Sequence, residues 1–246
     1  MTYCLAIRLD EGLVLTSDSR TNAGIDQVST YSKMHTFGID GERQFVLLSA
    51  GNLATTQAVV NRLERDIADN AEASLNSVEY LSQAAEYLGE INRNQASKFS
   101  DAVVQGDFNP EATFLLGGQI GAQPPAIYLI YPQGNYISAS AETPFLLLGE
   151  SKYGKPILDR IITPATSLQD AVHCSLVSMD STMRSNATVG PPIEIMVYVK
   201  DSLRLDHRLR LDADDPYLLQ LKKAWDKNLK QAFVKLPKLD WRRNDE

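Results

Sequence analysis

The sequence predicts an α+β protein in which two stacked β-sheets are covered by helices on both outer faces. Patterned segments follow one another in the order strands, two helices, strands, two helices, strands. A parallel sheet built from βαβ units would instead need single helices between single strands. The GxGxxG loop that marks doubly wound nucleotide-binding folds is also missing from the sequence.

Apolar runs rich in β-branched residues predict the strands. They cover about residues 3–9, 12–17, 34–39, 44–50, 112–118, 126–131, 134–140, 144–148, 193–200 and 202–211. A tight hairpin at Asp10, Glu11 and Gly12 joins the first two strands.

Apolar residues at three- and four-residue steps predict the helices. They cover about residues 53–70, 75–94, 154–163, 167–183 and 217–236. Ser74 stands where the N-cap of the second helix would stand. That helix carries Leu81, Tyr87, Leu88 and Ile91, which is more apolar surface than one sheet contact requires, so we expect a subunit interface there.

Each helical stripe needs one burial surface, which fixes the expected layers. The helices at 53–70 and 75–94 should lie side by side on one sheet, with 154–183 covering the opposite sheet. We expect a single domain over residues 1–246, in which 216–246 form a C-terminal helix and a charged tail. This last segment is interpreted mainly as solvated, with a docking role as the alternative.

The composition excludes several classes of protein. Apolar residues make up 43% of the 246 residues and charged residues 22%, as in a soluble globular protein with a sizeable core. A net charge of −7 argues against a nucleic-acid partner, and no apolar run reaches the roughly 20 residues of a membrane span. The first residues lack the basic region of a secretory signal, and Cys4 and Cys174 are too few for a disulfide framework. We therefore expect a cytoplasmic protein.

Thr2 is the first residue with a chemical signature. Removal of Met1 requires a short side chain at the next position, and threonine qualifies. Removal would place a hydroxyl and a free α-amine on one residue, and the amine, with a pKa of about 7.7–8.0, can take the hydroxyl proton. Any threonine at position 2 meets this test, so an ordinary processed N-terminus remains the alternative.

Three further residues become candidates for a catalytic site if they lie close to Thr2. Asp18 ends the second predicted strand, and the hairpin register brings it back to the start of the first. Lys33 opens the third strand, where its ammonium would lower the hydroxyl pKa and hold Asp18 ionised. Gly51 precedes a helix, where an exposed N–H suits oxyanion stabilisation. The structural alternatives are a turn at Asp18, a solvated Lys33 and a plain strand-to-helix connection at Gly51.

The joint pattern resembles a known family. A threonine after Met1, TSDSR at the end of the second strand, a lysine about 15 residues on and LLSAGNLATT before a long helix are similar to the proteasome β-subunit and HslV proteases. The bacterial proteasome-like Anbu family is the nearest in pattern, over nearly the whole chain. The resemblance implies the four-layer αββα sandwich of N-terminal-nucleophile hydrolases. It assigns the nucleophile to Thr2, its acidic partner to Asp18, its lysine to Lys33 and the oxyanion glycine to Gly51.

The resemblance also suggests supporting and pocket residues. The family's Gly-Ser-Gly turn falls on Gly149, Glu150 and Ser151, so that Glu150 takes the serine position. Its Arg-Asp-x-x-Ser-Gly element has loose counterparts in Asp180 and Ser185, and Ser19 is a further supporting candidate. By the same comparison the specificity pocket would be lined by Thr21, Tyr31, Ser49 and Leu53.

The expected activity is cleavage of peptide bonds by a threonine-type endopeptidase, on peptide or protein substrates, without a cofactor or metal. The family resemblance implies self-assembly into rings or open-ring, helical stacks. Two alternatives stay open: an assembly or scaffold protein with little peptidase activity, and an amidase acting on a non-peptide substrate. His35, His173 and His207 lack metal-ligand spacing, and no GxSxG elbow is present for a serine hydrolase.

Overall fold

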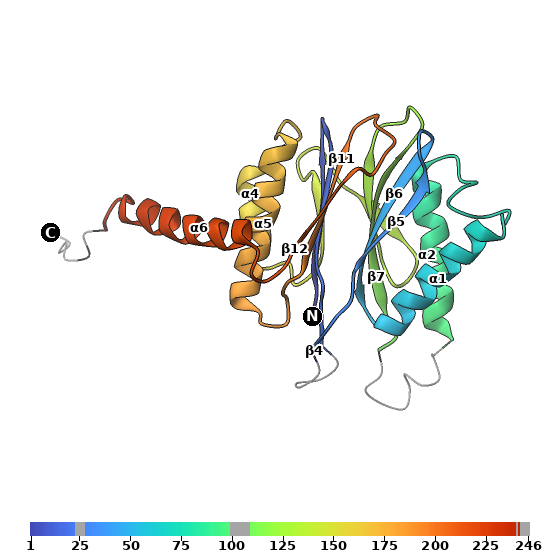
Figure 1. Ribbon diagram of the computed structural model, residues 1–246, viewed down its shortest axis with the longest axis horizontal. Coiled ribbons are helices and arrows are strands. Elements are labelled where there is room, and N and C mark those ends of the chain that lie inside the picture. The colour runs from blue at the N-terminus through green and yellow to red at the C-terminus, as the bar shows by residue number, and fades with distance from the viewer. Residues whose placement is uncertain (23–27, 99–108, 240, 242–246) are drawn as a thin grey trace.

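The computed structural model describes residues 1–22, 28–98, 109–239 and 241 (Figure 1). Within these residues two five-stranded antiparallel sheets lie face to face, in the strand orders β10-β1-β2-β11-β12 and β5-β6-β7-β8-β9. The first sheet consists of β1 (Tyr3–Leu9), β2 (Gly12–Asp18), β10 (Phe145–Gly149), β11 (Ile193–Val199) and β12 (His207–Leu211). The second consists of β5 (Met34–Ile39), β6 (Arg43–Gly51), β7 (Ala112–Ile120), β8 (Ala126–Ile130) and β9 (Tyr136–Ser138).

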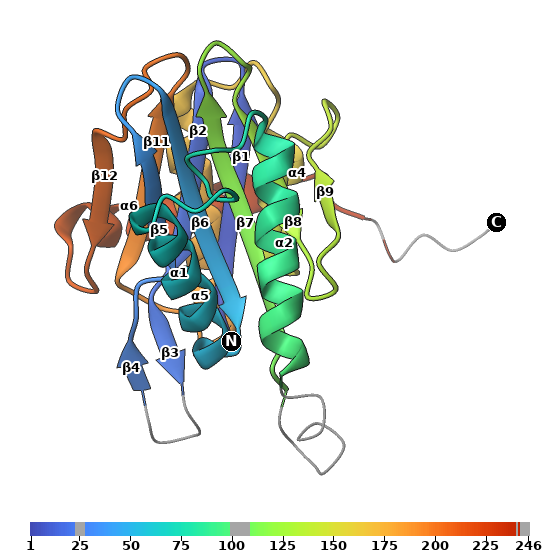
Figure 2. The ribbon, with the colours of Figure 1, turned by 90° about the vertical axis from the view of Figure 1, so that its right-hand side faces the viewer.

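Helices cover the outer face of each sheet, which confirms the four-layer αββα sandwich (Figures 1 and 2). Helices α1 (Leu53–Ala68) and α2 (Leu81–Ser97) pack on the second sheet. Helices α4 (Lys155–Ile161) and α5 (Leu168–Ser185) pack on the first. The expected pairing of helices with opposite sheets is therefore correct. Helix α6 (Pro216–Val234) begins beside α5 and then projects away from the sandwich (Figure 1).

Three buried clusters hold the four layers together in the described part of the chain. One lies between the first sheet and α4–α5 and includes Tyr3, Leu158 and Met179. A second lies between the other sheet and α1–α2 and includes Phe45 and Leu63. The third fills the space between the two sheets. Since every strand alternates its side chains between two faces, each central strand feeds two of these clusters.

The start of α2 is a correction to the sequence-based prediction. The helix begins at Leu81 with Tyr80 as its N-cap residue, and Ser74 lies in a preceding turn in which its N–H bonds to the Ser77 hydroxyl. This turn buries Leu75 against the second sheet, so that an apolar residue at helical spacing belongs to a non-helical segment. The Gln83 side chain accepts the N–H groups of Glu79 and Tyr80 and thereby fixes the true helix start.

Other departures lie in polar segments. A small hairpin, β3 (Arg20–Asn22) with β4 (Val28–Thr30), extends below the sandwich and carries no apolar alternation by which it could have been predicted (Figure 2). The last strand begins at His207 rather than at residue 202, because Asp201 and Leu203 adopt positive φ angles that turn the chain. No helix of the described residues is long and apolar enough to cross a lipid bilayer.

The expected surplus of apolar surface on α2 is also wrong. Leu81, Leu88 and Ile91 are all buried within the chain, and the Tyr87 hydroxyl donates a hydrogen bond to Asp66 on α1. Helix α6 instead carries five large apolar side chains that are exposed: Tyr217, Leu219, Leu229, Phe233 and Val234.

Candidate active site

Thr2 is held at the lower end of the sandwich, where β1 begins (Figure 1). Its carbonyl oxygen accepts a 2.8 Å hydrogen bond from the Glu150 N–H, next to the Tyr3–Gly149 pair that starts the β1–β10 ladder. Gly149 has φ of +80°, and a Cβ atom there would collide with the Thr2 carbonyl. A glycine is therefore needed for this close approach, which fixes the backbone of Thr2 on the sheet.

Asp18 and Lys33 form a buried ion pair directly behind Thr2. The β1–β2 register, in which Cys4 opposes Ser17, brings Asp18 to Tyr3, and the Tyr3 N–H donates to Asp18 Oδ1 at 3.1 Å. Lys33 Nζ lies 2.6 Å from the same oxygen and also donates to the Arg20 carbonyl at 2.8 Å. Asp18 is fully buried and Lys33 is 7% exposed.

The electrostatics of this pair follow from its burial. Burial raises the pKa of the Asp18 carboxyl, while the Lys33 ammonium and the N–H groups of Tyr3 and Gly190 oppose that rise. The Lys33 ammonium is thus the nearest positive charge to a carboxyl group that has no exposure of its own.

Gly51 closes the opposite side of the site. It ends β6 with φ of +114°, and a Cβ atom there would meet the Glu111 carbonyl. The next residue, Asn52, is the N-cap of α1, and its side chain accepts the Thr55 N–H at 3.2 Å. The positive end of the α1 dipole thus begins one residue after Gly51, which favours negative charge nearby.

Most of these residues line one cavity of about 420 Å³, and Asp18 lies outside the lining. Its lining includes Met1, Thr2, Lys33, Gly51 and Gly149. The four residues expected in the specificity pocket also line it: Thr21, Tyr31, Ser49 and Leu53. The residues that sequence reasoning missed are Arg20, Ser32, His35, Ala50, Thr56 and Gln57. Burial lowers the pKa of His35, so the imidazole is neutral at physiological pH.

Comparison with known proteins agrees with this geometry. The family described as Proteasome subunit matches residues 2–198. The chain belongs to the proteasome subunit family. Its structure is similar to those of the Anbu (ancestral β-subunit) protein from Yersinia bercovieri, with 44% identity and a TM-score of 0.92 over 98% of this chain and 100% of that one. A search of curated proteins gave no match.

Two further Anbu structures show the same likeness. The Anbu protein from Pseudomonas aeruginosa, solved as a helical assembly, is 46% identical with a TM-score of 0.92, over 98% of this chain and 100% of that one. Anbu from Hyphomicrobium sp. strain MC1 is 41% identical with a TM-score of 0.88, over 97% and 99% of the two chains. The Anbu resemblance seen in the sequence is therefore confirmed over the whole length.

Ser19 lies in a polar cluster beside the Asp18–Lys33 pair. Its hydroxyl donates to Glu194 Oε2 at 3.3 Å, and the Ser32 hydroxyl donates to the same oxygen at 2.6 Å. Arg208 Nη2 donates to Glu194 Oε1 at 2.7 Å. Glu194, on β11, is therefore one of the residues that flank Asp18 and Lys33. The sequence did not indicate it, because a single polar residue in an apolar strand carries no recognisable pattern.

Glu150 and Ser151 form a turn next to Thr2. Glu150 Oε2 accepts a hydrogen bond from Asn186 at 2.9 Å, and Lys152 Nζ lies 3.2 Å from Oε1. Ser151 uses backbone groups, donating to Gly149 and accepting from Lys155. Among the described residues no hydrogen bond joins either side chain to Thr2, so in this family member the turn holds Thr2 through the backbone N–H of Glu150.

Asp180 and Ser185 are not brought to the cavity, which corrects the expected support. Asp180 lies on α5 facing α6, 3.9 Å from Lys222, where burial raises its pKa. Ser185 is the exposed last residue of α5, which runs two residues further than the sequence predicts. The support comes from the following loop instead.

Gly190 in that loop carries the contacts. Its N–H donates to Asp18 Oδ2 at 3.2 Å, and its carbonyl accepts the N–H groups of Ser19 and Arg20, both at 3.3 Å. Arg20 Nη1 donates to the Ala187 carbonyl at 2.6 Å. Most of these bonds are made by backbone groups, which every residue type has. The amino-acid sequence of the loop therefore could not predict them.

The thiols of Cys4 and Cys174 are both buried, and neither is suited to reaction. Burial raises the pKa values of both thiols, that of Cys174 to about 12. A thiol in this state carries almost no thiolate at neutral pH. In the described residues no group of three or more His, Cys, Asp or Glu side chains is placed to hold a metal ion.

Proposed function

We propose that this proteasome-family chain is a threonine-type N-terminal-nucleophile hydrolase that cleaves peptide bonds after removal of Met1. The observation that carries the proposal is the buried Lys33–Asp18 pair, bonded to the N–H next to Thr2 and facing a cavity that Thr2 and Gly51 also line. Such a pair is costly in a fold that does not use it, since burial of two charges gains little stability.

Maturation is the first step of the proposed mechanism. Met1 lines the cavity and is 63% exposed, so an aminopeptidase can reach the bond that follows it. Hydrolysis of that bond turns the Thr2 amide nitrogen into an amine, which is a base only when free.

Acyl transfer then proceeds in two steps, acylation of Thr2 and hydrolysis of the resulting ester. Thr2 Oγ attacks the scissile carbonyl carbon while its proton passes to the α-amine, directly or through water, and the Gly51 N–H stabilises the oxyanion. Collapse of the tetrahedral intermediate breaks the C–N bond, and the α-ammonium returns the proton to the leaving amine. Water then hydrolyses the ester on Thr2 by the reverse proton path.

Lys33 and Asp18 tune the nucleophile in this mechanism. The ammonium favours the alkoxide character of Thr2 Oγ and the neutral form of the α-amine, while Asp18 holds the Lys33 side chain in place. The Asp18 carboxylate is in turn fixed by two backbone N–H groups, so the charge is already oriented before substrate binds.

We further propose that the chain works as a homo-oligomer, in a ring or an open-ring helical stack. The described relative from Pseudomonas aeruginosa forms a helical assembly. An assembly of this kind would confine the cavity and restrict its substrates to unfolded peptides.

A covalent probe tests the proposal. Chains whose mass shows loss of Met1 are incubated with a peptide epoxyketone, which needs both a hydroxyl and an amine on one residue to react. We expect one adduct on Thr2 in the mature chain, none in Thr2→Ala, and an unchanged adduct in the exposed strand variant Thr36→Ala. A mature chain that refuses the probe would support the scaffold alternative. An adduct without peptide turnover, together with hydrolysis of small amides, would support the amidase.

A further inference from the structure

Helix α6 carries an apolar stripe that begins on the body of the molecule and continues beyond it. Leu218 is fully buried and Leu221 packs against the same core cluster. Trp225 lines a cavity beside α5. Leu229 and Phe233 continue the stripe at four-residue steps on the same face of the helix, and Leu236 follows two residues after the helix ends at Val234.

The distal part of the stripe has no cover within the described chain. Leu229 is 53% exposed, Phe233 73%, Val234 77% and Leu236 58%, and together they line an apolar hollow at the end of the helix. Leu218 is the one buried residue of α6. Because isolated helices of this length are marginal in water, a projecting arm with this much apolar surface requires a partner.

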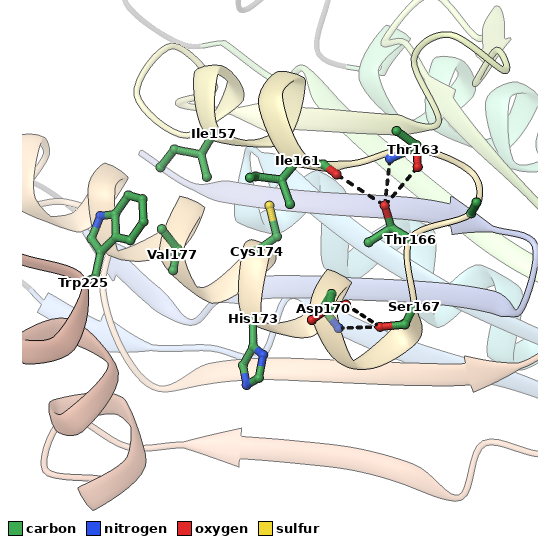
Figure 3. Close-up of a pocket in the computed structure, with 11 residues that line it drawn as sticks. Ile157, Ile161, Thr163, Thr166, Ser167, Asp170, His173, Cys174, Val177 and Trp225 are labelled. Carbon is green, nitrogen blue, oxygen red and sulfur yellow. Dashed lines mark hydrogen bonds between the residues drawn. The ribbon is translucent and has the colours of Figure 1, made fainter. Parts of the chain in front are cut away.

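A receiving groove lies on the outer helical layer of the same chain. Figure 3 shows Ile157 and Ile161 from α4 facing Cys174 and Val177 from α5 across a cavity of about 620 Å³, with Trp225 at one end. Ile161 is 54% exposed. The other end is polar and includes Asp170 and Thr166 (Figure 3). The groove therefore suits an amphipathic helix with apolar anchors and basic flanks.

Charge favours a second copy of this chain as the occupant. Residues 216–246 hold eight Lys or Arg and four Asp or Glu, a net +4, which leaves −11 of the total −7 on residues 1–215. A basic arm and an acidic body attract one another between copies.

Geometry excludes the chain's own arm as the occupant. One uninterrupted helix runs from Pro216 to Val234, and Trp225 already lies at the groove. At about 1.5 Å per residue, Leu229 lies roughly 6 Å and Phe233 roughly 12 Å further along the helix, in the direction in which α6 leaves the sandwich (Figure 1).

We propose that residues 229–236 of one copy dock into the α4–α5 groove of a second copy. The contact is head-to-tail, since the arm of each copy enters the groove of the next, and such contacts build open helices or rings. It rests on the self-assembly proposed above and is independent of the hydrolytic chemistry.

Two complementary variants test the docking. Leu229→Glu/Phe233→Glu disables the arm and leaves the groove intact, whereas Ile161→Glu disables the groove and leaves the arm intact. All three positions are exposed, so each variant should fold, which circular dichroism checks. Gln220→Glu/Gln231→Glu adds the same charge to the opposite face of α6 and is the matched control. Light scattering at micromolar concentration measures the mass.

We expect wild type and the control to form oligomers and each disabled variant alone to be a monomer of 27.2 kDa. An equal mixture of the two disabled variants should form dimers and nothing larger, because it offers one working arm for one working groove. Assembly by the groove variant alone would show arm–arm pairing and overturn the proposal. A mixture that stays monomeric, or a monomeric wild type, would also overturn it. Epoxyketone labelling is read separately, so a failed hydrolase and a failed docking are told apart.

Discussion

The ammonium of Lys33 and the carboxylate of Asp18 are 2.6 Å apart, in a place where neither side chain has much access to water. The free energy of their mutual attraction is largely offset by the cost of removing both charges from water, so the pair as a whole adds little to stability. Removal of one partner is different, because it leaves the other charge buried and uncompensated. The two residues proposed to tune Thr2 are therefore also a fragile part of the fold.

Substitution of Lys33 separates the two effects. We expect Lys33→Met to cost about 3–5 kcal/mol of unfolding free energy and to reduce epoxyketone labelling on the order of 10²-fold or more. The double variant Lys33→Met/Asp18→Asn should recover most of the stability without the labelling. Urea unfolding and labelling rates of the three chains measure this, and labelling that returns together with stability would remove Lys33 from the mechanism.

The pH dependence of labelling reports on the same pair. Burial raises the pKa of Asp18, so on acidification the carboxylate takes up a proton at a higher pH than the ordinary value of about 3.9. The rate should therefore fall on the acid side above that value, and rise toward pH 8 as the α-amine loses its proton. Asp18→Asn should retain the amine-dependent rise and lose the lower step. An unchanged lower step in that variant would assign it to another group.

At the scale of elements, the ladder between β1 and β10 holds Thr2 through one glycine. Gly149→Ala would place a methyl group against the Thr2 carbonyl, whereas Gly121, which also has a positive φ, has open space around its Cβ position. We expect Gly121→Ala to cost only the backbone strain, about 1–2 kcal/mol. Gly149→Ala should cost more and reduce labelling by about 10²-fold, because it displaces Thr2, the proposed nucleophile. Equal effects of the two substitutions on labelling would contradict this role of Gly149.

Much of the sheet architecture was predictable, since β1 and β5 coincide with the expected apolar runs. The hairpin register that follows from the short turn also predicts that Asp18 lies beside the first strand. What could not be predicted depends on backbone groups or on polar segments. Gly190 contacts Asp18 through its N–H, and the β3–β4 hairpin has no apolar alternation. The predicted start of α2 near Leu75 was wrong, because Leu75 is buried in a turn and does not belong to the helix.

At the scale of the whole molecule, α6 is attached at its first turns alone. Leu218 and Leu221 pack on the core of the first sheet, and the distal stripe contacts no core cluster of the described chain. The apolar spacing of α6 was evident from the sequence, but its exposure was not, because a stripe looks the same whether it is covered by its own chain or by another.

Truncation should separate folding from association. Deletion of residues 229–246 is expected to change the unfolding free energy of the monomer by no more than about 0.5 kcal/mol, whereas Leu218→Ala should cost about 2–5 kcal/mol. The truncated chain should nevertheless lose the dependence of its melting temperature on protein concentration. Calorimetry over a range of concentrations measures both, and a large loss of monomer stability on truncation would mean that the arm packs on its own body.

The positions of the chain ends determine how the protein can be handled in the laboratory. The N-terminus lies at the cavity, whereas α6 carries the chain away from the sandwich toward its other end (Figure 1). An affinity tag fused before Thr2 would make this residue internal. Under the proposed mechanism, the purified protein would then fold correctly but fail to react with the epoxyketone. A tag fused after α6 would crowd the proposed contact between copies. The turn at Gly121, which has open space around it, is where an inserted tag would disturb neither.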